Sequence, residues 1–188
     1  MNLHRTLPAA LLALAAPAAL AQEAVSFGTN WVAQAEHGGF YQAVADGTYA
    51  ACGLDVTIVP GGPQVNNRAQ LAAGKIDFYM GGSLLQAFAA VKEGIPSVVV
   101  AADFQKEPQV LLTHPGAVSS FEEIAGLDEM IVGNLGYETF YRWLVTEHGF
   151  APEKRVPYAF NPAPFIANPR SAQQGYVTSE PYAIEQAA

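Results

Sequence analysis

The residues best suited to bind a small molecule begin in the turn after the first predicted strand. This turn contains Asn30, Trp31, Glu36 and His37. A tryptophan ring can stack on a planar heterocycle and contribute about 0.5–1.5 kcal/mol beyond area burial, and asparagine and histidine form hydrogen bonds. The Glu36 carboxylate would repel an anion but could bind an amino-substituted ring. The turn therefore favours an aminopyrimidine-like ligand over nitrate or a sulfonate, although Trp31 could instead pack the edge of a lobe and His37 could face solvent.

Further candidate contacts lie at the third predicted strand and in the second half of the chain. Tyr79 belongs to that strand, and Gly82 and Ser83 follow it with backbone N–H groups and a hydroxyl at a helix start. In the second half, Tyr137 could stack on a ring and Glu180 could supply a carboxylate. Each has a structural alternative, because serine commonly caps helices and a first-turn glutamate complements the helix dipole.

Covalent chemistry has little support in the sequence. No G-x-S-x-G, H-E-x-x-H or Walker pattern occurs, and His114 and His148 have the settings of surface residues. Cys52 is the only cysteine, so it can form neither an internal disulfide nor a cysteine-based metal site. We therefore expect no catalytic residue, no metal and no cofactor.

Residues 1–21 have the pattern of a secretory signal peptide, with a positive Arg5, an apolar stretch over 7–18 and a small-residue cleavage site at 19–21. Their removal leaves 8 of the 9 Lys and Arg residues against 17 Asp and Glu residues. Such an acidic chain lacks the basic face that nucleic acids require and is not attracted to anionic lipid. No other segment is long enough to span a bilayer. We expect a periplasmic protein without membrane insertion after cleavage.

The elements that must position these residues form a βαβαβ pattern between 27 and 78. This order predicts a parallel sheet with helices on its faces, and ligands of such sheets bind beyond the carboxyl ends of the strands. Strands are predicted over 25–31, 54–59, 76–80, 97–102 and 109–113, and helices over 40–51, 64–73 and 83–93.

A second α/β unit is predicted after the break at His114-Pro115-Gly116. The sequence thus divides into the signal peptide, a first lobe at 22–113 and a second lobe at 114–188. In the second lobe, helices are predicted over 121–125 and 137–148 and from 179, and strands over 130–133 and 173–178.

Several motifs resemble those of the periplasmic solute-binding proteins of ABC importers, in the branch of nitrate, sulfonate and thiamine-pyrimidine-precursor binders. The resemblance covers essentially the whole mature chain. The motifs are Asn30-Trp31, Glu36-His37-Gly38-Gly39-Phe40-Tyr41, Gly53-Leu54-Asp55-Val56, Ala73-Gly74-Lys75-Ile76-Asp77-Phe78 and the run from Gln173 to Pro181.

The resemblance implies an α/β fold of the type II periplasmic-binding-protein kind, with two lobes that close on a ligand. Family members continue past the second lobe and return to the first. This chain ends at Ala188, so we expect a C-terminal truncation in which the second lobe does not return to the first.

The implied function is that of an extracytoplasmic binding component that delivers a small ligand to an ABC permease. The preferred ligand is a thiamine pyrimidine precursor or another planar nitrogen heterocycle. The alternatives are a nitrate or taurine-like alkylsulfonate binder and, from another class, the pyrimidine-precursor synthase of thiamine biosynthesis. That synthase uses a cysteine-rich iron site, which a chain with one cysteine cannot form.

Overall fold

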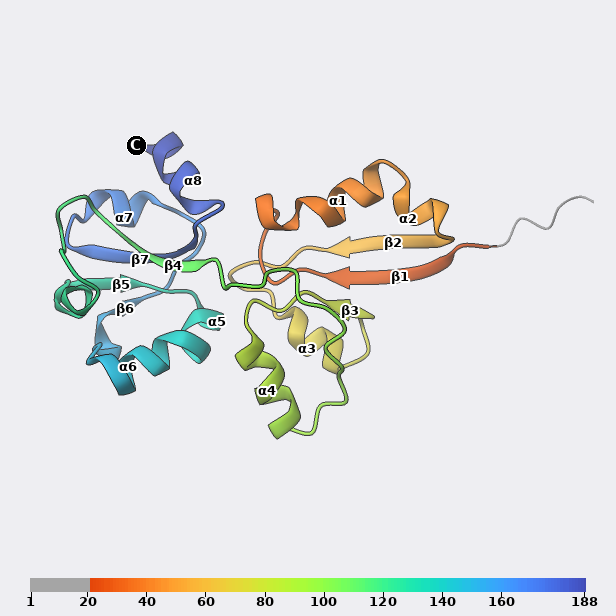
Figure 1. Ribbon diagram of the computed structural model, residues 1–188, viewed down its shortest axis with the longest axis horizontal. Helices are drawn as coiled ribbons and strands as arrows, with labels where there is room; N and C mark the ends of the chain where they lie inside the picture. The colour runs from red at the N-terminus through yellow and green to blue at the C-terminus, as the bar shows by residue number, and fades with distance from the viewer. Residues whose placement is uncertain (1–20) are drawn as a thin grey trace, which may run out of the picture.

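The computed structural model describes residues 21–188, which form two sheets that lie side by side, each flanked by helices (Figure 1). Most strand pairs are parallel, which confirms the predicted α/β class. The predicted signal peptide, apart from Ala21, lies outside the described residues. Within the described residues, we find no helix with the length and apolar character needed to cross a membrane.

The first sheet has the order β2-β1-β3, and all of its strands are parallel. Its middle strand pairs on both sides, with Phe27 opposite Ile58 and Phe78. The carboxyl ends of the three strands therefore meet at one edge, as the βαβαβ pattern predicts. The strands are β1 (Glu23–Gly28), β2 (Leu54–Val59) and β3 (Phe78–Tyr79).

Four short helices flank this sheet, two on each side (Figure 1). The single helix predicted over 40–51 is divided in two, because Gly47 takes a left-handed conformation with φ of 78°. Asn66 and Ser83 cap the next two helices by accepting hydrogen bonds from backbone N–H groups. The helices are α1 (Gly38–Ala45), α2 (Thr48–Ala51), α3 (Asn67–Ala72) and α4 (Leu84–Lys92), and a 3-10 turn (Ala35–His37) precedes α1.

The second sheet has the order β4-β7-β5-β6, with only the β4–β7 pair antiparallel. β4 pairs with β7 here, whereas the sequence-based boundary assigns 109–113 to the first lobe. We therefore propose that residues 93–108 are the crossing segment between the lobes. The strands are β4 (Gln109–Thr113), β5 (Glu129–Ile131), β6 (Arg155–Val156) and β7 (Ser171–Tyr176).

Short helices cover both faces of the second sheet (Figure 1). The predicted helix at 137–148 begins with a π-helical turn and ends at Gly149, which is left-handed with φ of 69°. The helices are α5 (Asn134–Gly136), the π turn (Tyr137–Tyr141), α6 (Arg142–His148), α7 (Ala163–Ala167) and α8 (Glu180–Ala187), with 3-10 turns at Glu122–Gly126 and Pro152–Lys154.

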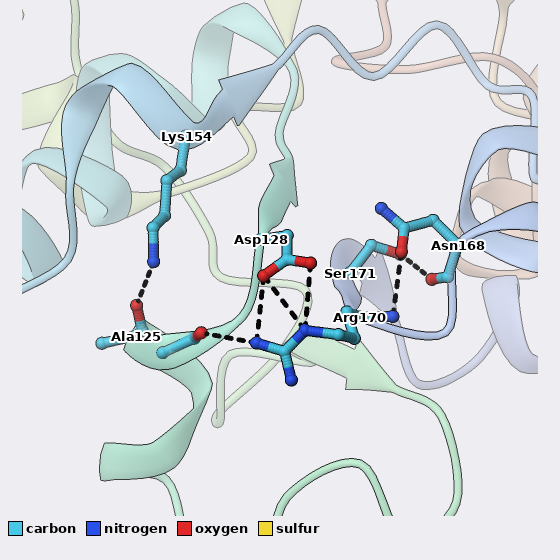
Figure 2. Close-up of polar contacts among 7 residues, drawn as sticks. Ala125, Asp128, Lys154, Asn168, Arg170 and Ser171 are labelled. Carbon is cyan, nitrogen blue, oxygen red and sulfur yellow. Dashed lines mark hydrogen bonds and ion pairs between the residues drawn. The ribbon is translucent and has the colours of Figure 1, made fainter.

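The apolar core is concentrated in the second lobe. One cluster surrounds Met130, Tyr141 and Leu144 on one face of the sheet, and another joins Ile131 to Tyr158 and Phe165. At the amino ends of β5 and β7, the Arg170 guanidinium forms two-pronged hydrogen bonds with the Asp128 carboxylate at 3.0 Å, as Figure 2 shows. This pair lowers the pKa of Asp128.

Lys154 lies beside that pair, where its Nζ donates to the Ala125 carbonyl oxygen at 2.9 Å (Figure 2). Two cations thus contribute to the end of the second lobe where β5 and β7 begin. That end lies opposite the carboxyl ends of the same strands, so neither cation lies at the carboxyl ends of β5 and β7.

The first lobe and the crossing segment that follows it leave much apolar surface exposed. The prediction of a buried strand over 97–102 is wrong, because this segment forms no strand and Val98 and Val100 are 84% and 77% exposed. A β-branched run favours a strand only when a neighbour supplies the pairing partner, and none of the described strands pairs with this run. Likewise, Phe88 and Val91 of α4 are 61% and 74% exposed.

Candidate ligand cleft

A narrow cleft of about 50 Å³ lies between the two lobes, at the carboxyl ends of β1, β3, β5 and β7. That space suits a few water molecules. Six of the nine residues predicted to bind a ligand line it, and their role as ligand contacts stays a prediction. These six are Asn30, Trp31, Glu36, Gly82, Ser83 and Glu180.

The lining also contains residues beyond the nine that were predicted to bind a ligand. They fall into two groups, glutamines and residues that follow or end the strands of the second sheet. Gln109 is among them because β4 runs antiparallel to β7, which places the start of β4 beside Tyr176 at the end of β7. The additional lining residues are Gln34, Gln86, Gln109, Gly133, Leu135, Gly136, Thr139, Gln174, Gly175 and Tyr176.

The first-lobe edge of the cleft is held by a buried polar network. Thr29 Oγ1 donates to the Trp31 carbonyl at 2.7 Å and accepts from Gly61 N–H at 3.0 Å. Asn67 Nδ2 donates to the carbonyl oxygens of Thr29 and Val59, at 2.9 and 3.0 Å. These bonds join the ends of β1 and β2. A Cβ atom at Gly61 would collide with the Thr29 carbonyl oxygen, so this close approach requires glycine.

His37 is buried next to the cleft and does not line it. The ring is fully buried, and its Nδ1 accepts a hydrogen bond from Gln34 N–H at 3.2 Å. Because a backbone N–H can only donate, Nε2 carries the proton and donates to Asn30 Oδ1 at 3.0 Å. Burial lowers the pKa of His37, against the opposing effect of Glu36 and Asp103. A neutral His37 thus fixes the orientation of the Asn30 amide.

Trp31 joins the lobes as well as lining the cleft. Its ring stacks on Tyr158 of the second lobe with centroids 5.7 Å apart and planes inclined by 19°. A Cβ atom at Gly133 would lie 3.7 Å from the Trp31 ring, so this wall of the second lobe also approaches the indole. Both readings of Trp31 from the sequence therefore describe part of its environment, since it packs at a lobe edge and also faces the cleft.

The two cleft carboxylates are engaged with the protein. Glu36 Oε2 accepts from Thr178 Oγ1 at 3.2 Å and from Ser179 Oγ at 2.6 Å. Glu180 Oε1 accepts from Gln34 Nε2 and from the Tyr158 hydroxyl, both at 3.2 Å. Glu180 is 3% exposed and Glu36 is 9% exposed, so both carboxylates are shielded from water.

Primary amides supply the hydrogen-bonding surface of the cleft. Gln174 Oε1 accepts from Gly133 N–H at 2.8 Å, and Gln86 Oε1 accepts from the Tyr79 hydroxyl at 3.4 Å. With both oxygens occupied, each amide keeps its N–H₂ group for another acceptor. No Lys or Arg occurs among the described residues that line the cleft. The site is therefore amide-rich and carries carboxylates without cations.

Tyr176 closes the cleft near the start of α4. Its hydroxyl donates to the Gly82 carbonyl oxygen across the lobes at 3.3 Å. Burial, together with the carboxylates of Glu107 and Glu36, raises the pKa of Tyr176. The phenol is therefore neutral, and its proton is available for this bond.

Two predicted stacking residues do not line the cleft. Tyr79 lies behind Gln86, and burial raises the pKa of its hydroxyl to about 12. Tyr137 packs against the core of the second lobe, with the Arg155 guanidinium 5.0 Å from its ring centroid. Neither ring is in position to stack on a molecule in this cleft.

A comparison with protein-family profiles identifies a related family. Residues 34–168 match the family profile described as NMT1/THI5 like, which covers more than half of the chain. A search of curated proteins gives no match. Within the described residues, no three His, Cys, Asp or Glu side chains are grouped so that they could hold a metal ion.

Proposed function

The chain belongs to the NMT1/THI5-like family, which groups nitrate, sulfonate and thiamine-precursor binding proteins, and from this premise we propose which solute it binds. The proposed ligand is an uncharged planar nitrogen heterocycle, such as a thiamine pyrimidine precursor. The chain would present this ligand in the periplasm to the permease of an ABC importer.

The composition of the cleft lining carries the proposal. Ring nitrogens of a pyrimidine can accept from the amide N–H₂ groups of Asn30, Gln86 and Gln174, and an amino substituent can donate to side-chain or backbone oxygens. An anion would have to give up its hydration next to Glu36 and Glu180 without a compensating cation. The lining thus favours an uncharged solute.

Nitrate or an alkylsulfonate is the second candidate, and one feature favours it. Gly82 and Ser83 line the cleft at the start of α4, where backbone N–H groups and the helix dipole attract anions. One of these groups is already used, because Leu85 N–H donates to Ser83 Oγ at 3.2 Å. The nearby carboxylates also oppose an anion, so we rank this candidate second.

The pyrimidine-synthase alternative receives no support from the geometry. Its iron site requires cysteines, and Cys52 lies exposed between α2 and β2. This position is at the amino end of β2, at the edge of the sheet opposite the cleft. Binding without covalent chemistry is therefore the mechanism that we propose.

Ligand entry requires the lobes to separate, because the cleft is too narrow for a pyrimidine ring. The proposed cycle is opening about the crossing segment 93–108, entry of the solute and closure by the contacts that join the lobes. Closure excludes water, which strengthens the hydrogen bonds between the amides and the ligand.

Thermal unfolding of residues 22–188 in the presence of single solutes tests this proposal. The panel contains hydroxymethylpyrimidine, formylaminopyrimidine, taurine and nitrate. A ligand at about 100 times its dissociation constant stabilises the folded state by about 2.7 kcal/mol, which raises the melting temperature by several degrees. We expect this shift with the pyrimidines alone. A shift with taurine or nitrate alone would overturn the proposal in favour of the second candidate.

A further inference from the structure

Glu36 makes a direct contact between the lobes. It lies in the 3-10 turn that precedes α1 in the first lobe, and the two hydroxyls that donate to its carboxylate come from the residues just before α8 in the second. Thr178 and Ser179 both donate to the same carboxylate oxygen, at 3.2 and 2.6 Å. The bond from Ser179 is the shorter of the two.

A second contact joins the same two segments, but here the donor is in the first lobe and the acceptor is in the second. Gln34 Nε2 of the first lobe donates to Glu180 Oε1 of the second at 3.2 Å. Glu180 is fixed within its own lobe, because its other oxygen accepts from Tyr176 N–H at 2.7 Å and its first oxygen also accepts from the Tyr158 hydroxyl. A Cβ atom at Gly175 would lie 2.7 Å from the Glu180 Cβ, so glycine is needed there for Glu180 to take this position.

Both carboxylates rely on neutral donors. Of the described Lys and Arg side chains, none forms an ion pair with Glu36 or Glu180. Hydrogen bonds to a buried acceptor stabilise the arrangement that forms them, because the acceptor would otherwise be left unpaired. On opening, however, water would replace the hydroxyls around Glu36 and recover its hydration. The contact therefore stabilises the closed arrangement and remains reversible.

We propose that Glu36 is a positioning residue whose bonds to Thr178 and Ser179, together with the Gln34–Glu180 bond, fasten the two lobes. We call these five residues the interlobe clasp. The clasp assigns Glu36 and Glu180 a role other than ligand contact, and it does not depend on which solute the cleft binds. Since both donors of Glu36 use one oxygen, the bonds require an acceptor atom at that place and not a negative charge.

The distance between the lobes tests the clasp without any ligand. Cys52 is the only cysteine and is exposed, so it takes a spin label in the first lobe. A second label at Glu185→Cys, on the exposed side of α8, reports on the second lobe. Pulsed electron resonance on residues 22–188 then gives the distribution of distances between the two labels.

We expect Glu36→Ala and Ser179→Ala to move this distribution to longer and broader distances. Glu36→Gln should restore the parent distribution, because its carbonyl oxygen can accept the same two bonds. The matched control is Glu147→Ala, which removes an exposed carboxylate from α6 and should change nothing.

Unchanged distributions in Glu36→Ala and Ser179→Ala would overturn the clasp, as would a Glu36→Gln chain that opens as far as Glu36→Ala. If Glu36→Ala does not fold, Ser179→Ala decides alone, since it removes a single hydroxyl at a half-buried position. No solute is added, so a negative result with the pyrimidine panel leaves this test unaffected.

Discussion

The two lobes are stabilised in different ways. The second lobe buries a continuous apolar core, in which Met130, Val132 and Ala172 are 0% exposed. In the first lobe, the buried apolar side chains are Ile76 and Ala90, while several polar side chains are buried at the strand ends. These are Thr29, Glu36, His37, Asn67 and Gln86.

This difference shows that order at the cleft does not require an apolar core beneath it. The polar network of Thr29 and Asn67 joins the ends of β1 and β2, and His37 orients Asn30. These hydrogen bonds are directional, so they fix the first-lobe side of the cleft. The second lobe supplies the rigid wall, with Gly133 and Gln174 hydrogen-bonded at the ends of β5 and β7.

The largest expected effect is on the free energy of unfolding, when a core side chain of the second lobe is removed. Met130→Ala should lower the free energy of unfolding by about 2–5 kcal/mol, because it creates a cavity in a packed interior. Phe88→Ala, at a position 61% exposed in the first lobe, should change it by less than about 0.5 kcal/mol. Urea unfolding followed by far-UV circular dichroism measures both. An equal loss in the two variants would contradict the contrast between the lobes.

The next effect concerns the wall of the cleft in the second lobe. Gln174→Ala should weaken the binding of hydroxymethylpyrimidine about fivefold or more, since one net hydrogen bond is worth about 1 kcal/mol. The control is Gln42→Ala on the exposed surface of α1, which should bind as the parent chain does. Calorimetric titration of both chains provides the comparison. Equal affinities would remove Gln174 from the site.

The smallest effect is a pH dependence that originates in the first lobe. Burial lowers the pKa of His37, so the unfolded chain takes up a proton at a higher pH than the folded chain does. The contribution of His37 to stability is therefore present above the unfolded pKa of about 6.5 and is lost as the pH falls towards the lowered folded value.

Replacement of His37 should reduce this dependence. The loss of melting temperature between pH 7.5 and 5.5 should be smaller in His37→Gln than in the parent chain. All other titratable groups are common to both chains, so the difference isolates the histidine. Identical pH profiles would show that His37 does not titrate differently on folding.

The local pattern of the sequence predicted much of the first sheet. The strand 54–59 is confirmed, as is the meeting of the strand ends at one edge. Ser83 caps α4, as serine at a helix start commonly does. These features depend on alternation, glycine stops and caps, which are set by neighbouring residues.

The features that the sequence could not predict depend on distant partners. Gln109 and Gln174 reach the cleft because β7 lies between β4 and β5, an order that no local pattern encodes. The run 97–102 has the β-branched composition of a strand but lacks a pairing partner among the described strands. The sequence likewise gave no sign that Thr178 and Ser179 meet Glu36, since more than 140 residues separate them.

The most direct test of the proposed function uses the fluorescence of Trp31. Trp143 is the other tryptophan and is 52% exposed on α6, so Trp143→Phe leaves Trp31 as the only indole. Titration of this variant with hydroxymethylpyrimidine should give a saturable change in emission, and taurine and nitrate should give none. A saturable change with either anion, together with no response to the pyrimidine, would contradict the account of an amide-lined cleft for uncharged heterocycles.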